Sequence, residues 1–266
     1  MLHNTGKSLI HYDLVGPSDA PVVCMTHSLT SDGGMWAEQV PVLLGAGFQV
    51  LRVDMRGHGG STPTKGDYTI DALASDVVSL LDALGFDTGV HLIGLSMGGM
   101  VGLVIAADHP GRLASLMACC TASHWAGDTE LMLSRIAAVR QSGTLESIVE
   151  ANMERRYGPD YRSRRPQRWQ ALRDTFLGTS LDGYYGCMNA CMTHNVAPRL
   201  HQVSVPTLVL AGTEDLATPA SDNRQIAATI PGARYVEIEG GYHFPNVEYD
   251  DQFNRIMLDW MNEVRG

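Results

Sequence analysis

The stretch His91-Leu-Ile-Gly94-Leu-Ser96-Met-Gly98-Gly-Met100 decides the fold of this chain. It begins as a short apolar strand, and from Met97 the pattern is that of a helix that we expect to run to Asp108. A serine stands between them, with a glycine two residues before it and another two residues after it. Strand and helix must pass close together at so sharp a turn, so a Cβ at either glycine would collide with the other segment. The stretch therefore predicts a strained turn with an exposed Ser96 at its tip, facing the positive end of a helix.

The pattern Gly94-x-Ser96-x-Gly98 is that of a nucleophile elbow, in which a strand-to-helix turn presents a reactive serine. A pattern this short arises by chance too readily to decide a function alone. Its weight depends on whether the rest of the chain supplies the sheet and the partner residues that such a serine needs.

Strand-like and helical patterns alternate along most of the chain. Runs typical of buried parallel strands lie at 21–25, 48–53, 90–93, 113–118, 207–212 and 234–239, and we expect 8–14 to form an edge strand. Apolar residues at helical spacing occupy 36–44, 69–84, 97–108 and 250–264. This alternation predicts a mostly parallel, doubly wound sheet that binds its ligands beyond the carboxyl ends of the strands.

The alternation stops between residues 124 and 203. This segment contains helical stretches at 131–139, 145–153 and 169–176, separated by Gly and Pro breaks, and no run typical of a buried strand. We therefore expect a helical cap at 124–203, inserted into a core domain formed by 1–123 and 204–266. The predicted fold class is α/β, with the cap lying over the strand ends.

Composition excludes some partners. The 266 residues carry a formal net charge of −10, which argues against nucleic acid or an anionic membrane as the main partner and leaves a small molecule. No apolar run has the length of a membrane span, and the first residues lack the layout of a signal peptide. Five cysteines are an odd number, and none has a standard zinc spacing. We expect a cytoplasmic protein without metal or cofactor, and leave a homo-oligomer open.

A serine hydroxyl needs a general base, and the base needs a group that orients it. On this architecture the acid and the histidine follow the serine in chain order, each after a later strand. Asp215 follows the strand at 207–212, and His243 follows the strand at 234–239. Glu214 is a rival acid, but the turn at Ala217-Thr-Pro219 favours Asp215. The loop after 113–118 offers no carboxylate before Asp128, which again favours Asp215.

Cleavage of an acyl group also requires two N–H donors for the oxyanion. We expect one from Met97, the residue after the nucleophile, and the other from Leu29, in the loop after the strand at 21–25. His27 and His58 are predicted to brace loops through their side chains rather than to act as bases. Arg56 is expected to pair with Asp54 or with a neighbouring loop.

These motifs resemble the α/β-hydrolase superfamily, and within it the 3-oxoadipate enol-lactonases, over nearly the whole chain. They are His27-Ser-Leu-Thr, Met35-Trp, Asp54-x-Arg-Gly-His-Gly-x-Ser61, Gly94-Leu-Ser-Met-Gly-Gly99, Ala211-Gly-x-x-Asp215-x-Ala-Thr-Pro219 and His243-x-Pro-Asn. Trp125, Arg135-Ile-Ala-Ala-Val-Arg140 and Gly183-Tyr-x-Gly-Cys187-x-x-Ala190 look like the cap of these lactonases. The resemblance implies the α/β-hydrolase fold and a Ser96–His243–Asp215 triad.

The resemblance also bears on the substrate. His27 stands where these lactonases usually carry Asn, and Thr30 where they usually carry Gly, so the resemblance leaves open whether the natural substrate is the carboxylated enol-lactone. An anionic substrate would need a cation, for which Arg135 is the candidate, although such an arginine is more often a surface ion-pair partner. The predicted walls of the acyl pocket are Trp125, Met132, Arg135, Tyr184 and Met188.

The sequence thus predicts a serine hydrolase that cleaves a carboxylic ester or lactone through an acyl-enzyme. A cofactor-free perhydrolase and a carbon–carbon bond hydrolase would use the same triad, and both remain open. A small-ligand receptor with vestigial hydrolysis is the alternative outside enzymes, since a fold does not fix a function.

Overall fold

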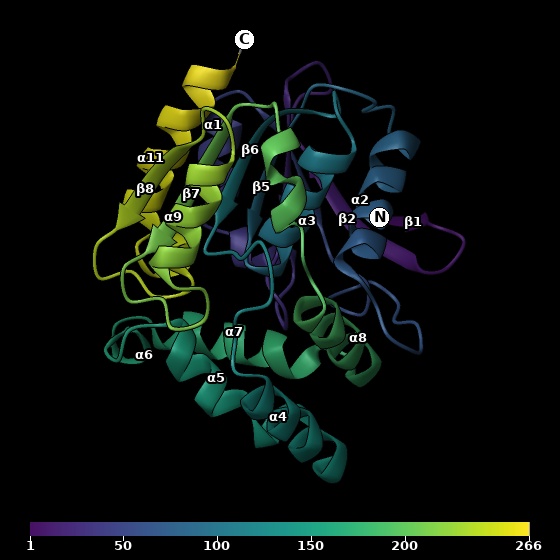
Figure 1. Cartoon of the computed structure of the whole chain (residues 1–266), viewed down its shortest axis with the longest axis vertical. Helices are drawn as coiled ribbons and strands as arrows, with labels where there is room; N and C mark the ends of the chain where they lie inside the picture. Colours follow the sequence, from purple (N-terminus) through teal and green to yellow (C-terminus); the bar gives the residue numbers. More distant parts are fainter. Residues whose placement is uncertain (266) are drawn as a thin grey trace.

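The computed structural model describes residues 1–265 and has an eight-stranded sheet at its centre (Figure 1). The strand order is β1-β2-β4-β3-β5-β6-β7-β8. The strands are β1 (Leu2–Asn4), β2 (Leu9–Val15), β3 (Val22–Thr26), β4 (Gln49–Val53), β5 (Val90–Leu95), β6 (Leu113–Cys119), β7 (Thr207–Gly212) and β8 (Arg234–Ile238). All pairs from β4 to β8 are parallel, whereas β1 and β2 are antiparallel to their neighbours. The predicted mostly parallel, doubly wound sheet is confirmed.

The predicted edge strand is wrong in its position. β2 lies between β1 and β4, so the edge of the sheet is β1. β1 has only three residues, and its Leu2 is 59% exposed. A strand so short and so exposed leaves no apolar alternation in the sequence from which it could be predicted.

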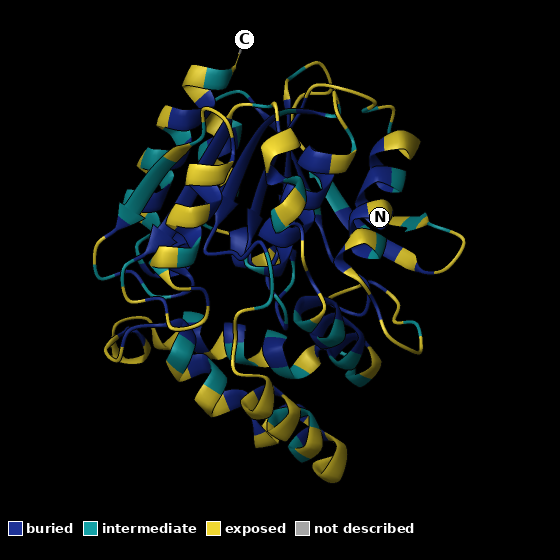
Figure 2. Ribbon diagram, viewed as in Figure 1, coloured by how far each residue is buried: buried dark blue, intermediate teal, exposed yellow. Residues whose placement is uncertain are grey.

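Helices cover both faces of the sheet, and the inner strands β3 to β7 are almost entirely buried, whereas β1, β2 and β8 are partly exposed (Figure 2). One face packs against α2 (Ile70–Ala83), α3 (Met97–Asp108) and α9 (Ala220–Thr229), and the other against α1 (Val40–Gly45) and α11 (Asp250–Val264). The bounds of α3 and α11 agree with the prediction. The helix expected at 36–44 is instead a 3₁₀ turn, η1 (Gly33–Trp36), followed by α1. A short helix, α10 (Pro245–Glu248), precedes α11.

The segment between β6 and β7 is helical, and Figure 1 shows its helices gathered at one end of the sheet. They are α4 (Thr129–Ser142), η2 (Leu145–Ser147), α5 (Val149–Arg156), α6 (Tyr161–Arg164), α7 (Pro166–Gly178) and α8 (Leu181–Met192). The last helical piece of the segment, η3 (Ala197–Gln202), lies instead against α3 and α9. This is the segment in which the sequence predicts a cap, and the boundaries at 124 and 203 remain a prediction.

The helix α8 was not predicted from the sequence, because two glycines, Gly183 and Gly186, interrupt its helical pattern of apolar residues. Both are close-contact positions. A Cβ on Gly183 would lie 2.4 Å from the Gly57 carbonyl oxygen, and one on Gly186 would lie 2.6 Å from the ring of Tyr68. The glycines therefore let α8 pack directly on the loop after β4.

The turn between β5 and α3 has the strained geometry that the sequence predicts. Ser96 has φ +56° and ψ −116°, a region that non-glycine residues rarely occupy. A Cβ on Gly94 would lie 2.3 Å from the Gly98 carbonyl oxygen, and one on Gly98 would lie 2.2 Å from the Thr26 carbonyl oxygen. The two glycines thus allow α3 to start directly against β3 and β5, and this close approach holds Ser96 at the tip of the turn.

Candidate active site

A cavity of about 490 Å³ lies between the carboxyl ends of the strands and the helices that follow β6. Ser96 and His243 both line it. Of the other residues predicted from the sequence, those in the lining are Leu29, Trp125, Met132, Arg135 and Met188. Met97 and Tyr184 have buried side chains and are not in the lining. Residues from distant parts of the chain are therefore brought to one concave site, as binding of a small molecule requires.

The predicted base and acid are hydrogen-bonded to each other. The distance from His243 Nδ1 to Asp215 Oδ2 is 2.8 Å, and both residues are almost completely buried. The other carboxylate oxygen, Oδ1, accepts the backbone N–H groups of Ala217 and Thr218 at 2.7 and 3.0 Å. The Thr218 hydroxyl donates to Asp215 Oδ2 at 2.7 Å. These contacts hold the carboxylate so that it can orient the imidazole.

The electrostatics of Asp215 favour its ionised form. Burial acts to raise the pKa of this carboxyl group, but the His243 ring and the donors of Thr218 act in the opposite direction. The net result is a pKa below the ordinary value for Asp. The carboxylate therefore remains charged at neutral pH and can stabilise a protonated His243.

The Ser96 hydroxyl makes no hydrogen bond to the His243 ring within residues 1–265, although both line the cavity. Such bonds are often long or poorly aligned before substrate binds. The main chain of Ser96 is fixed more firmly: its N–H donates to the Cys119 carbonyl at 2.9 Å, and its carbonyl accepts the Thr121 hydroxyl at 2.8 Å. The turn is thus anchored to β6 and to the loop after it.

Two backbone N–H groups near Ser96 have the character of oxyanion donors. Met97 is the first residue of α3, where N–H groups have no partner within the helix. The N–H of Leu29 has no hydrogen-bond partner among the described residues, and Leu29 lines the cavity. The carbonyl group of the same peptide, that of Ser28, is held by two hydrogen bonds: it accepts from His27 Nδ1 at 2.7 Å and from the Ser31 N–H at 3.2 Å.

His27 and His58 brace this loop, as predicted. His27 Nε2 accepts the Met55 N–H at 2.7 Å, so its proton is on Nδ1. His58 Nε2 accepts the Thr30 N–H at 3.0 Å, and His58 Nδ1 donates to the Arg56 carbonyl at 3.2 Å. Both rings must be neutral to make these bonds. Burial lowers the pKa of His27 and lowers that of His58 to about 3, which favours this state.

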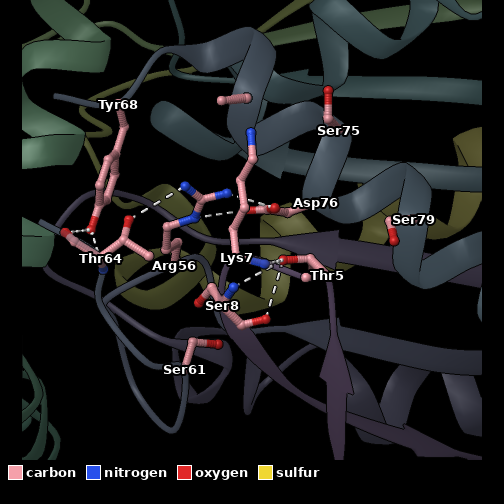
Figure 3. A network of polar contacts seen from close by, with 12 residues as sticks. Thr5, Lys7, Ser8, Arg56, Ser61, Thr64, Tyr68, Ser75, Asp76 and Ser79 are labelled. Carbon is pink, nitrogen blue, oxygen red and sulfur yellow. Dashed lines mark hydrogen bonds and ion pairs between the residues drawn. The ribbon is translucent and has the colours of Figure 1, made fainter. Parts of the chain in front are cut away.

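One of the two arrangements expected for Arg56, an ion pair with Asp54, is wrong. Figure 3 shows its guanidinium against Asp76 of α2, with Nη2–Oδ1 and Nε–Oδ2 distances of 2.7 and 2.9 Å. The same group lies over the Tyr68 ring. Asp54 instead accepts the N–H groups of Gly33 and Gly60. The buried ion pair fixes the loop that carries Met55 and His58, and so supports the histidine brace from outside the cavity.

The cavity contains two arginines that the sequence analysis did not single out for a site. Arg155 and Arg156 line it together with Arg135, and none of the three forms an ion pair with a carboxylate among the described residues. Two carboxylates, Asp128 and Asp222, line the cavity as well. Arg155 and Arg156 end α5, where basic residues commonly interact with the helix dipole, so their position in the chain gave no sign of a site.

No group of three or more His, Cys, Asp or Glu residues suited to a metal ion occurs in the part of the chain that the structure describes. No helix within residues 1–265 combines the length and the apolar character needed to cross a membrane.

Comparison with known proteins identifies the same fold. The family model described as alpha/beta hydrolase fold matches residues 21–249. The chain therefore belongs to the α/β-hydrolase family and is an enzyme of the hydrolase class. It is 31% identical over 245 residues to 3-oxoadipate enol-lactonase 2 of Acinetobacter baylyi, covering 92% of this chain and 90% of that protein.

Solved structures show the same relationship. The enol-lactonase from Burkholderia xenovorans LB400 matches with a TM-score of 0.94 and 35% identity, covering 98% of this chain and 100% of that one. A thermophilic esterase from Thermogutta terrifontis, solved with malate bound, matches with a TM-score of 0.89 and 27% identity, covering 99% and 97%. The resemblance to enol-lactonases inferred from the sequence is thus confirmed.

The neutral state of His58 predicts an acid-sensitive fold. Its folded pKa of about 3 lies below the unfolded value near 6.5, so between these values only the unfolded chain takes up the proton. Stability due to this group is complete above pH 6.5 and is lost as the pH falls. In urea unfolding between pH 7.5 and 5.5, we expect His58→Asn to be less stable than wild type at pH 7.5 but to lose less stability on acidification. An equal or steeper loss in the variant would contradict this role.

Proposed function

We propose that this hydrolase cleaves a carboxylic ester or lactone through a Ser96–His243–Asp215 triad and an acyl-enzyme. The observation that carries the proposal is the buried 2.8 Å contact between His243 Nδ1 and Asp215, at a cavity that Ser96 also lines. Two further features support it: the strained turn at Ser96, and the Leu29 N–H, which has no hydrogen-bond partner within residues 1–265. The names of the enol-lactonase relatives support the substrate type.

In the proposed reaction, Ser96 Oγ attacks the carbonyl carbon while His243 Nε2 takes the hydroxyl proton. The N–H groups of Leu29 and Met97 bind the resulting oxyanion. The tetrahedral intermediate then collapses, and His243 gives its proton to the departing alkoxide, or to the ring oxygen of a lactone. A water molecule attacks the acyl-enzyme with His243 as base, which releases the acid and restores the serine. Asp215 stays ionised throughout and stabilises the imidazolium.

We further propose that the substrate carries a carboxylate in addition to the bond that is cleaved. Arg135, Arg155 and Arg156 line the cavity, and none of the three guanidinium groups pairs with a carboxylate within residues 1–265. Arginine binds carboxylates in a two-point geometry. Apolar walls formed by Met132 and Met188 suit the carbon chain between the two ends of such a substrate. The malate bound to the Thermogutta esterase gives a related protein with a dicarboxylate ligand.

The triad is tested by Ser96→Ala and Asp215→Asn. Loss of the nucleophile should lower kcat for short p-nitrophenyl esters by at least about 10³-fold, and Asp215→Asn should lower it by about 10³- to 10⁴-fold because the imidazole loses its orientation. Ser163→Ala, which changes an exposed serine of the cap segment, serves as the control with unchanged kcat. Circular dichroism checks that each variant is folded. Wild-type kcat in Ser96→Ala would refute the proposed mechanism.

The substrate class is tested with two p-nitrophenyl esters of equal chain length, a neutral one and one that ends in a carboxylate. We expect wild type to prefer the anionic ester in kcat/KM, and Arg135→Met to reduce this preference by about 10- to 100-fold, the size of a lost charge-assisted hydrogen bond. Arg140→Met removes an exposed arginine from the same helix and should keep the preference. A wild-type enzyme that prefers the neutral ester would contradict an anionic substrate.

A further inference from the structure

A buried arginine joins the helices over the cavity to the loop that carries the Leu29 N–H. Arg156 is the last residue of α5 and is only 8% exposed. Its Nη2 donates to the Leu29 carbonyl at 2.8 Å and to the Thr30 hydroxyl at 2.7 Å. Its Cζ lies over the ring of Phe176 and over that of Phe244, 5.1 and 5.0 Å from their centroids. A charged group from one segment is therefore held on the backbone of another.

This arginine is charged but has no carboxylate partner in the described part of the chain, residues 1–265. Burial lowers the pKa of Arg156 to about 10, so the group still carries its proton at neutral pH. Peptide and hydroxyl oxygens and two aromatic faces compensate for the charge. A neutral side chain could fill the same space at a smaller desolvation cost, so the charge calls for an explanation beyond packing.

With the Arg156 contact, side chains hold both of the peptide groups that flank the Cα of Leu29. In the peptide between Leu29 and Thr30, the carbonyl is held by Arg156 and the N–H by His58. In the preceding peptide, the Ser28 carbonyl is held by His27, which leaves the Leu29 N–H as the free donor. The direction of this free N–H is set by both neighbouring contacts, because rotation of either peptide would move it.

The backbone conformation of Thr30 is a second observation that points to a role for the contact between Arg156 and this loop. Its φ is +55°, in the left-handed region that disfavours a β-branched side chain. The Thr30 hydroxyl donates to the Leu29 carbonyl at 2.6 Å and accepts from Arg156 at 2.7 Å. Thr30 therefore contacts both Leu29 and Arg156 through its hydroxyl group. A glycine at this position would avoid the strain but would lack the hydroxyl.

We propose that Arg156 is a positioning residue for the reaction: it holds the loop so that the Leu29 N–H points at the developing oxyanion. The inference rests on the proposed function. It makes the helix α5 part of the machinery that stabilises the transition state, in addition to forming a wall of the cavity. The contact is made to the loop itself, so its effect extends to substrates that carry no charge.

The test uses Arg156→Met and Arg156→Lys with a neutral ester, p-nitrophenyl acetate. Removing one oxyanion donor costs about 10²- to 10³-fold in kcat, so loosening one should cost less. We expect kcat to fall about 10- to 100-fold in Arg156→Met with KM changed less than threefold, and to fall by a smaller factor in Arg156→Lys. Arg162→Lys, at an exposed arginine of α6, is the matched control and should keep wild-type kcat.

Inhibition by a trifluoromethyl ketone distinguishes a positioning role of Arg156 from a merely structural one. Its adduct with Ser96 has an oxyanion, whereas the matching methyl ketone binds without forming one to a significant extent. The inhibition constant for the trifluoromethyl ketone should rise by the same factor by which kcat falls, and that for the methyl ketone should stay unchanged. Equal weakening of both ketones, or a kcat within twofold of wild type in a folded Arg156→Met, would overturn the proposal.

The outcomes separate this inference from the proposed function. Thermal unfolding reports whether each variant is folded, and if Arg156→Met is not, Arg156→Lys decides by the same two criteria. Activity in Ser96→Ala would remove the proposed function and this inference with it. An inactive Ser96→Ala together with a fully active Arg156 variant would leave the triad intact and remove only the positioning role.

Discussion

The close approach of α3 to β3 and β5 is the constraint on which the rest of the site depends. A Cβ on Gly98 would lie 2.2 Å from the Thr26 carbonyl oxygen, so the helix can start where it does only without a side chain there. The same approach holds Ser96 at φ +56° and leaves the Met97 N–H at the free end of the helix. One steric condition thus sets the position of the serine together with that of the Met97 N–H, which we propose as an oxyanion donor.

The opposite side of the site depends on polar contacts rather than on close packing. Two neutral histidines hold the loop after β3 by accepting backbone N–H groups, and the buried Arg56–Asp76 ion pair fixes the loop that supports them. Arg156 adds a contact from α5. Contacts between segments far apart in the chain therefore fix the direction of one backbone N–H group, that of Leu29. The free energy of these contacts keeps the N–H oriented before a substrate binds.

The sequence was most informative where local pattern and packing agree. The bounds of α3 could be predicted because the glycine-flanked turn at Ser96 marks its start, and those of α11 because its apolar residues recur at helical spacing. The positions of Asp215 and His243 followed from the alternation of strands. β1 could not be predicted because three exposed residues have no period. The contact of Arg156 with Leu29 joins residues 127 positions apart, and no local pattern contains such information.

We propose that Ser96 becomes the covalent carrier of the acyl group. Reaction with a fluorophosphonate ester, followed by mass spectrometry of the intact chain and of its peptides, shows whether Ser96 is the nucleophile. We expect one adduct per chain, located on Ser96 and absent from Ser96→Ala. An unmodified chain, or an adduct on another residue with Ser96 unmodified, would contradict it.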